Sequence, residues 1–338
     1  GSTKNWPSSA SNWEFRFSEL QKNRIPKRDS LDRMATFILS YPDKTFVPRG
    51  AAAEQVAPGL PGQAFAQWLK LCDEIHRTLG RILVIDPGRV GSQSSVYAAL
   101  LGSSFLSPGK LPRPVFLRSN HGETAAEDAA SRAIADAGLE IQTAKHPWQG
   151  QVDIIPVERN RFVLTYGGSD QGSSHASVEE VKALLPMGAQ VMAIELSSTC
   201  PRGSAAIGFL TPPGGRSVAL VSRPALKSHS PEDLGRFIGD KVDVTILDAE
   251  DSAAFATEAL NVRGTLHLPP GCSTILRGLL FRRGFRLTEV DVSMLVGPSG
   301  GGPKLLACEL PGLVLSDEAP SYLLRRDRLH NLCAEYPT

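Results

Sequence analysis

The sequence has few of the features that assign a protein to a common chemical class. No apolar run approaches 18 residues, so no membrane-spanning helix and no membrane partner are predicted. The five cysteines are scattered and form no Cys-x-x-Cys pair, which disfavours a disulfide framework and fits reduced, intracellular thiols. The seven histidines form neither His-x3-His nor His-Glu-x-x-His, so no metal and no other cofactor is predicted.

The chain also lacks an excess of charge of either sign. It has 36 basic and 35 acidic residues, a formal net charge of +1. A polyanionic partner would therefore be held by a local basic patch and not by the field of the whole molecule. No RNA-recognition motif, KH loop or P-loop spacing is present. With 338 residues, 41% of them hydrophobic, the chain is long enough to bury a large core.

What the sequence does have is a repeated unit of strand, helix and strand. Four copies begin at residues 115, 162, 218 and 265, a spacing of about 50 residues that is typical of arrays of modules. Two helix starts are well marked. Ser230-Pro231 places proline at a first helical position, and Ser177 with Glu180 fits a capping box.

The repeats divide the chain into four predicted parts. Residues 1–62 are predicted to form an N-terminal arm with a short capped helix near residues 30–39 and a linker. Residues 63–80 form an amphipathic helix that leads into the core, and residues 81–310 form the repeat domain. Residues 311–338 form a basic C-terminal helix or tail. The fifth module would have to be assembled from residues 81–101 and 290–310.

Three segments resemble the pentein fold of the guanidino-group-modifying proteins, which includes dimethylargininases, arginine deiminases and amidinotransferases. Residues 94–119 resemble the strand pair of the first module. Residues 148–153, Trp-Gln-Gly-Gln-Val-Asp, resemble the substrate loop Glu-Gly-x-Gly-Asp. Residues 290–306 resemble the closing segment, in which a glycine-rich turn precedes the catalytic cysteine. The resemblance implies an α/β propeller of about five strand-strand-helix-strand modules.

The same resemblance implies that the chemistry has been lost. Enzymes of this family attack a guanidinium carbon with a thiolate, move protons with a histidine and hold the substrate with carboxylates. The positions that match cysteine, histidine and glutamate hold Leu305, Arg202 and Gln149, and Asp153 alone keeps its carboxylate. Cys308 lies at an odd offset from Leu305 in a strand, so it points to the opposite face and is expected in the core. We therefore expect a pseudoenzyme.

These replacements predict a pocket that prefers anions. Arg202 is expected close to Lys304 and Arg118, and backbone N–H groups of Gly300, Gly301 and Gly302 could point inward. Alternatively, the three glycines simply make a tight turn. Arg89 and Lys227 are two further cations near this predicted pocket. Each is either part of an anion-binding rim or an ordinary solvated surface charge.

An inactive pentein with basic segments at both ends resembles the paired guide-RNA-associated subunits of the kinetoplastid mitochondrial RNA-editing complex. That resemblance implies a related sister subunit in a hetero-oligomer with exchanged segments. It further implies recognition of guide RNA, including its 5′-triphosphate, and a mitochondrial location.

Two other functions stay open. One is an active guanidino-modifying hydrolase or transferase with Cys272 or Cys200 as nucleophile, which requires a thiol of depressed pKa. The other is a purely architectural oligomerisation subunit that binds no ligand.

Overall fold

In the computed structural model the described residues are 35–42, 60–85, 96–106, 114–120, 131–132, 134–136, 138–158, 160–168, 172–297 and 300–310. All of them belong to one compact unit that begins at Ala35. The predicted C-terminal helix and most of the predicted N-terminal arm lie outside the described residues.

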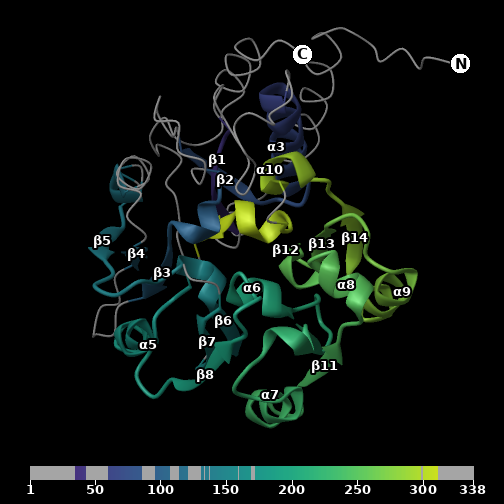
Figure 1. The fold of residues 1–338 in the computed structure, drawn as a ribbon. Coiled ribbons are helices and arrows are strands. Elements are labelled where there is room, and N and C mark those ends of the chain that lie inside the picture. The colour runs from purple at the N-terminus through teal and green to yellow at the C-terminus, as the bar shows by residue number, and fades with distance from the viewer. Residues whose placement is uncertain are drawn as a thin grey trace, which may run out of the picture. The chain divides into compact units, whose positions relative to one another are not determined.

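The described chain contains five three-stranded sheets that share one design (Figure 1). In each sheet the central strand pairs antiparallel with one neighbour and parallel with the other. The sheets are β15 (Cys308–Glu309), β1 (Thr36–Ser40), β2 (Arg81–Ile85); β3 (Gly102–Leu106), β4 (Pro114–Arg118), β5 (Glu140–Thr143); β6 (Ile154–Glu158), β7 (Arg161–Gly167), β8 (Gln190–Leu196); β9 (Ile207–Leu210), β10 (Ser217–Val221), β11 (Val242–Ile246); and β12 (Leu260–Val262), β13 (Thr265–Leu268), β14 (Arg286–Glu289).

A helical crossover joins each central strand to its parallel partner, because parallel strands cannot be joined by a tight hairpin. The labelled crossover helices are α3 (Leu60–Arg77), α5 (His175–Lys182), α7 (Pro231–Ile238) and α9 (Thr274–Arg282). Residues 131–132 and 134–136 are helical between β4 and β5. The strand–helix–strand repeat predicted from the sequence is therefore confirmed for the copies that begin near residues 162, 218 and 265.

Of the two helix starts predicted from capping residues, one is confirmed and the other is wrong. The predicted cap of α7 is confirmed, since the Ser230 hydroxyl accepts from the Asp233 N–H and the Asp233 carboxylate accepts from the Ser230 N–H. The predicted cap of α5 at Ser177 is wrong, because Ser174 caps that helix. Glu180 instead accepts the backbone N–H groups of Lys145 and His146, so a tertiary contact takes the side chain that the capping box would have used.

The sheet formed by β15, β1 and β2 corrects one prediction and confirms part of another. Residues 36–40 form the buried central strand β1 and not a short helix. Its apolar run Phe37-Ile38-Leu39 is fully buried between strands from distant parts of the sequence. The flanking strands β2 and β15 do come from the two segments that were predicted to meet. The core therefore begins well before residue 81.

Five short helical turns lie at corresponding places in the five units. They are η2 (Ala98–Leu100), η3 (Gly150–Asp153), α6 (Gly203–Ala206), η5 (Ala256–Glu258) and η7 (Pro303–Leu306), and each directly precedes the first strand of a sheet. Each turn contacts the next one in this order, and η7 contacts η2. The fold therefore gathers one segment from every unit; these five turns are called the central turns below.

Three shorter helical elements complete the described secondary structure: η4 (Arg223–Ala225), α8 (Ala249–Ala253) and α10 (Ser293–Val296). Apolar clusters fill the spaces between consecutive sheets. One of them joins Val163 and Ile194 of the β6–β8 sheet to Ala219 and Val221 of β10. Within the described residues, no helix combines the length and the apolar character that a membrane span requires.

Candidate functional site

The central turns are joined by a buried ion pair between Arg202 and Glu258. Arg202 Nε lies 2.5 Å from Glu258 Oε1, and Nη2 lies 2.9 Å from Oε2, which is the two-pronged geometry that arginine forms with carboxylates. The Arg202 side chain is 6% exposed and that of Glu258 is fully buried. Two further contacts hold the guanidinium: it donates to the Gly300 carbonyl at 3.0 Å and lies over the Phe255 ring.

Each oxygen of the Glu258 carboxylate accepts two hydrogen bonds from other groups of the chain. The Ser204 hydroxyl donates to Oε1 at 2.5 Å and the Gly302 N–H donates to Oε2 at 2.8 Å. Burial by itself would raise the pKa of Glu258, but the Arg202 charge and these hydrogen bonds outweigh it and lower that pKa. Burial likewise opposes the charge of Arg202, and Glu258 raises the pKa of Arg202 in spite of it. Both groups are therefore charged, and each neutralises the other.

A second buried carboxylate, Asp153, ties η3 to α6. Its Oδ1 accepts from the Thr165 hydroxyl at 2.8 Å and from the Gly203 N–H at 2.7 Å, and its Oδ2 accepts from the Ser173 hydroxyl at 2.5 Å. Burial raises the pKa of Asp153, and the hydrogen bonds and the Arg202 charge oppose the rise. Asp153 thus holds the backbone that carries Arg202.

Glycines are required where the central turns meet. A side chain at Gly203 would overlap the Thr165 hydroxyl, and one at Gly302 would lie 2.7 Å from the Glu258 carbonyl oxygen. Gly301 has φ +156°, and a Cβ there would lie 2.8 Å from Arg202 Nη2. The Gly302 N–H donates to Glu258, whereas the Gly300 N–H donates to the Gly297 carbonyl. The glycine-rich turn is thus packed against the ion pair.

The other residues predicted at the centre are close but differ in exposure. Leu305 is 3% exposed, and its Cδ2 would lie 3.0 Å from a Cβ at Gly301. Lys304, its neighbour in η7, is half-buried, and burial lowers its pKa against the opposing charges of Glu258 and Glu309. Gln149 is buried directly before η3, where its N–H donates to the Ser173 hydroxyl.

The remaining predicted cations have other environments. Arg118, at the end of β4, donates to the Ser131 hydroxyl at 3.4 Å. Lys227 is exposed and pairs with Glu195 at 2.5 Å. Arg89 lies outside the described residues.

The described thiols are buried, and burial disfavours their thiolate form. Burial raises the pKa of Cys200 and of Cys272 to about 11. Burial also raises the pKa values of Cys72 and Cys308. Cys308 is fully buried in β15, so its predicted place in the core is confirmed. Nowhere in the described ranges do three or more potential metal-ligating side chains converge.

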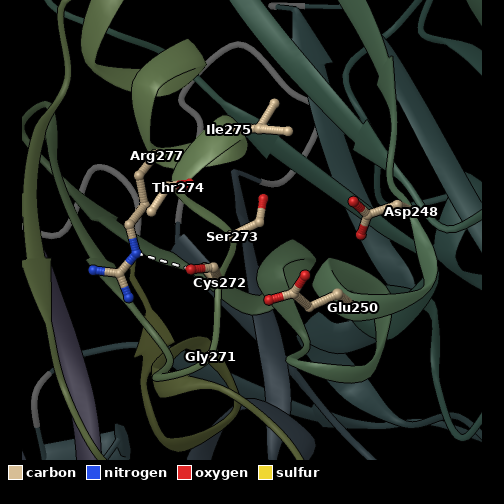
Figure 2. A pocket seen from close by; sticks show the side chains of 8 residues that line it. All are labelled: Asp248, Glu250, Gly271, Cys272, Ser273, Thr274, Ile275 and Arg277. Atoms are coloured by element: carbon tan, nitrogen blue, oxygen red, sulfur yellow. Dashed lines mark hydrogen bonds between the residues drawn. The ribbon is translucent and has the colours of Figure 1, made fainter.

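A pocket of about 510 Å³ lies at a different place, between the start of α8 and the first turn of α9 (Figure 2). Asp248 and Glu250 line one side, and Cys272 and Ile275 line the other. Arg277 borders it, donating from Nε to the Cys272 carbonyl at 3.0 Å and pairing with Glu289. Its cation is therefore already neutralised.

Sequence reasoning missed Glu258, which decides the charge of the centre. A signal for it was present: Asp153, Arg202 and Leu305 each lie just before the first strand of a unit, and Glu258 has the same place before β12. The supporting hydroxyls of Thr165, Ser173 and Ser204 carried no such signal.

Comparison with solved structures identifies the fold. The N-terminal domain of ArgZ, an arginine dihydrolase from the ornithine-ammonia cycle in cyanobacteria, matches with a TM-score of 0.66 and 18% identity over 84% of this chain and 100% of that chain. AgrE in a ternary complex with ornithine and NAD+ matches with the same TM-score and identity over 84% of this chain and 40% of that chain. DDAH from Pseudomonas aeruginosa, complexed with citrulline, matches with a TM-score of 0.58 and 12% identity over 82% and 99% of the two chains.

No protein-family model and no curated protein matches the sequence. At such identities the structural likeness shows the fold alone. The chain has the pentein fold, as the resemblance in its sequence predicted.

Proposed function

We propose that the chain is a catalytically inactive pentein, a pseudoenzyme that acts as a binding and assembly subunit built on a five-module propeller. The observation that carries this proposal is the Arg202–Glu258 ion pair. Together with Asp153 it links four of the five central turns through buried hydrogen bonds. Because these contacts hold the central turns together, we infer a structural role for them and not catalysis on a substrate.

The chemistry of the residues supports the loss of activity. Attack on a guanidinium carbon requires a thiolate and a group that carries protons, whereas Leu305 has neither a nucleophile nor a proton to exchange. An Arg202 guanidinium held by a carboxylate remains charged and is a poor proton carrier. ArgZ is an arginine dihydrolase, and AgrE has been seen with L-arginine. In this chain an arginine side chain of its own is bound among the central turns.

The test is an activity assay with L-arginine and its N-methylated derivatives. The readouts are the released ammonia or methylamine and the citrulline or ornithine that is formed with it. The ArgZ N-terminal domain serves as the positive control. We expect no product above the enzyme-free blank. Product formation that is abolished by Cys272→Ser or Cys200→Ser would replace this proposal with the hydrolase alternative.

The resemblance to guide-RNA-associated subunits supports RNA and a related sister subunit as partners, in a mitochondrial assembly. Because Glu258 neutralises Arg202, recognition of a 5′-triphosphate would depend on cations outside the pair, with Lys304 as the nearest candidate. Fluorescence anisotropy should compare one short RNA bearing a 5′-triphosphate with the same RNA bearing a 5′-hydroxyl.

A preference of about tenfold or more for the triphosphate, about 1.4 kcal/mol, that is lost in Lys304→Ala would support end recognition. Equal affinities would exclude it and leave recognition of the RNA backbone. If no RNA binds but a stable hetero-oligomer forms with the sister subunit, the purely architectural role is favoured.

A further inference from the structure

Three turns that are distant in the sequence pack together at one end of the fourth and fifth sheets. They are residues 211–216 between β9 and β10, residues 263–264 between β12 and β13, and residues 283–285 between α9 and β14. Asn261 Nδ2 donates to the Thr211 carbonyl at 2.9 Å, and the Arg286 N–H donates to the Gly264 carbonyl at 2.9 Å. A Cβ on Gly215 would lie 3.1 Å from the carbonyl oxygen of Arg283.

These three turns, together with Arg282 and Arg286 on either side of the third, are called the turn cluster here. It lies at the opposite ends of β9 and β12 from the central turns. β9 and β12 each begin directly after a central turn and end at the turn cluster. A ligand of the turn cluster would therefore be bound at a separate site.

The turn cluster is rich in arginine and poor in acid. Its arginines, all exposed, are Arg216, Arg263, Arg282, Arg283 and Arg286. Asp243 pairs with two of them, lying 3.4 Å from Arg216 and in contact with Arg283. Arg263, Arg282 and Arg286 form no ion pair with any described residue. Asp240 and Lys241 lie next to β11, and their charges offset each other. The cluster therefore concentrates positive charge in a chain whose net charge is +1.

One of these arginines has an unfavourable backbone conformation. Arg263 has φ +52° in a two-residue hairpin loop between Val262 and Thr265, where asparagine, aspartate or glycine is preferred. Arginine does not favour this left-handed backbone conformation. Its presence here therefore suggests that the side chain itself has a role.

An exposed aromatic residue lies next to two of the same arginines in the sequence. Phe281, in the last turn of α9, is 71% exposed, whereas the helix packs through Leu276 and Leu280. It directly precedes Arg282 and Arg283. Aromatic rings beside guanidinium groups are the combination that binds single-stranded nucleic acid, because the ring stacks on a base while the cations contact phosphates.

We propose that the turn cluster and Phe281 form a binding surface for single-stranded RNA, with the arginines on the phosphates and Phe281 stacked on a base. This inference rests on RNA being a partner of the chain, but it assigns the contact to a surface separate from the central turns. An acidic polypeptide could meet the same arginines, yet it would gain nothing from stacking on Phe281.

The test measures anisotropy of a labelled 15-nucleotide, 5′-hydroxyl RNA with the full chain at several salt concentrations. The main variant combines Arg263→Glu, Arg282→Glu and Arg286→Glu, three exposed residues that form no ion pair with a described residue. The second variant is Phe281→Ala. The matched control is Arg223→Glu, an exposed arginine that follows the opposite end of β10. Thermal unfolding of each variant verifies that it is folded.

We expect the triple variant to bind at least about tenfold more weakly. The slope of log K against log salt should shrink by roughly 2, since about 0.7 is lost for each phosphate contact to a single strand. Phe281→Ala should weaken binding by roughly fivefold or more, and Arg223→Glu should bind like the parent chain.

If the parent chain binds RNA and the triple variant binds equally well, the turn cluster is not the site, although RNA remains a partner. If the parent chain binds no RNA, the proposed partner fails together with this inference. If Phe281→Ala has no effect and polyglutamate competes as well as RNA, the surface binds acidic polypeptides, and the assignment to RNA is overturned.

Discussion

Replacing Glu258 by glutamine should be among the most destabilising single changes in this protein. The substitution keeps the size of the side chain but removes the charge that neutralises Arg202. The carboxylate accepts four hydrogen bonds, two from Arg202, one from Ser204 and one from Gly302. A glutamine amide has one oxygen, and its NH2 group would face donors.

The expected loss follows from leaving a buried cation without its partner. Removing one member of a buried ion pair costs about 3–5 kcal/mol, whereas replacing both members by uncharged groups is often close to neutral. Arg202 and Glu258 are both buried, so solvent cannot take over the role of the lost charge. For a domain of this size the loss corresponds to a fall in Tm on the order of 10 °C.

The assay is urea unfolding followed by tryptophan fluorescence, in a cycle with Arg202→Met and with the Arg202→Met, Glu258→Gln double variant. The double variant removes both charges and keeps one amide oxygen as an acceptor for Ser204 or Gly302. It should therefore be more stable than Glu258→Gln alone by about 2 kcal/mol or more. If Glu258→Gln costs less than about 1 kcal/mol, or if the two changes are additive, the pair does not hold the central turns together and the reasoning is wrong.

Three further predictions concern burial. His267 is fully buried, and neither of its ring nitrogens has a hydrogen-bond partner among the described residues. Burial lowers its pKa from 6.5 to about 4. As the pH falls, the unfolded chain therefore binds a proton before the folded chain does, and the free energy of unfolding should fall by about 3 kcal/mol between pH 6.5 and pH 4. Unfolding titrations of His267→Phe should lack that part of the pH dependence, and identical pH profiles for the two proteins would contradict it. Gly203→Ala should lower the free energy of unfolding in urea by about 1–3 kcal/mol, because the added methyl group overlaps the Thr165 hydroxyl. The control Gly62→Ala, which has open space around it in α3, should be neutral or stabilising. Equal effects of the two substitutions would show that the central turns can rearrange to accommodate a side chain. With pKa values near 11, Cys200 and Cys272 should react slowly with alkylating reagents at pH 7.5, and peptide mapping that finds either one labelled rapidly in the folded protein would refute their unreactive state.

The sequence predicted the repeated modules well because their signals are local. The central strands β7, β10 and β13 begin within one residue of the predicted starts, and Ser230-Pro231 located the start of α7. Each of these units has short-range hydrophobic patterning that agrees with the final fold, although of the two predicted caps only that of α7 is confirmed. The same local reading failed for Thr36–Ser40, whose short apolar run fits a helix or a strand equally well. Pairing with β2 and β15, which are distant in the sequence, decides that this segment is a strand.

The candidate site divides in the same way. The sequence by itself determined which side chains stand at Leu305, Arg202 and Gln149, because the identity of a side chain is a local fact. That they replace the reactive and carboxylate groups of the pentein enzymes stays a prediction from the resemblance. It could not determine the charge of the centre, since that depends on which groups become neighbours. Only the tertiary structure brings Glu258 to Arg202 across 56 positions of the chain and buries both. In a region of low polarity an ion pair and an uncompensated arginine differ by several kcal/mol, so the partner supplied by the fold decides what the arginine can bind.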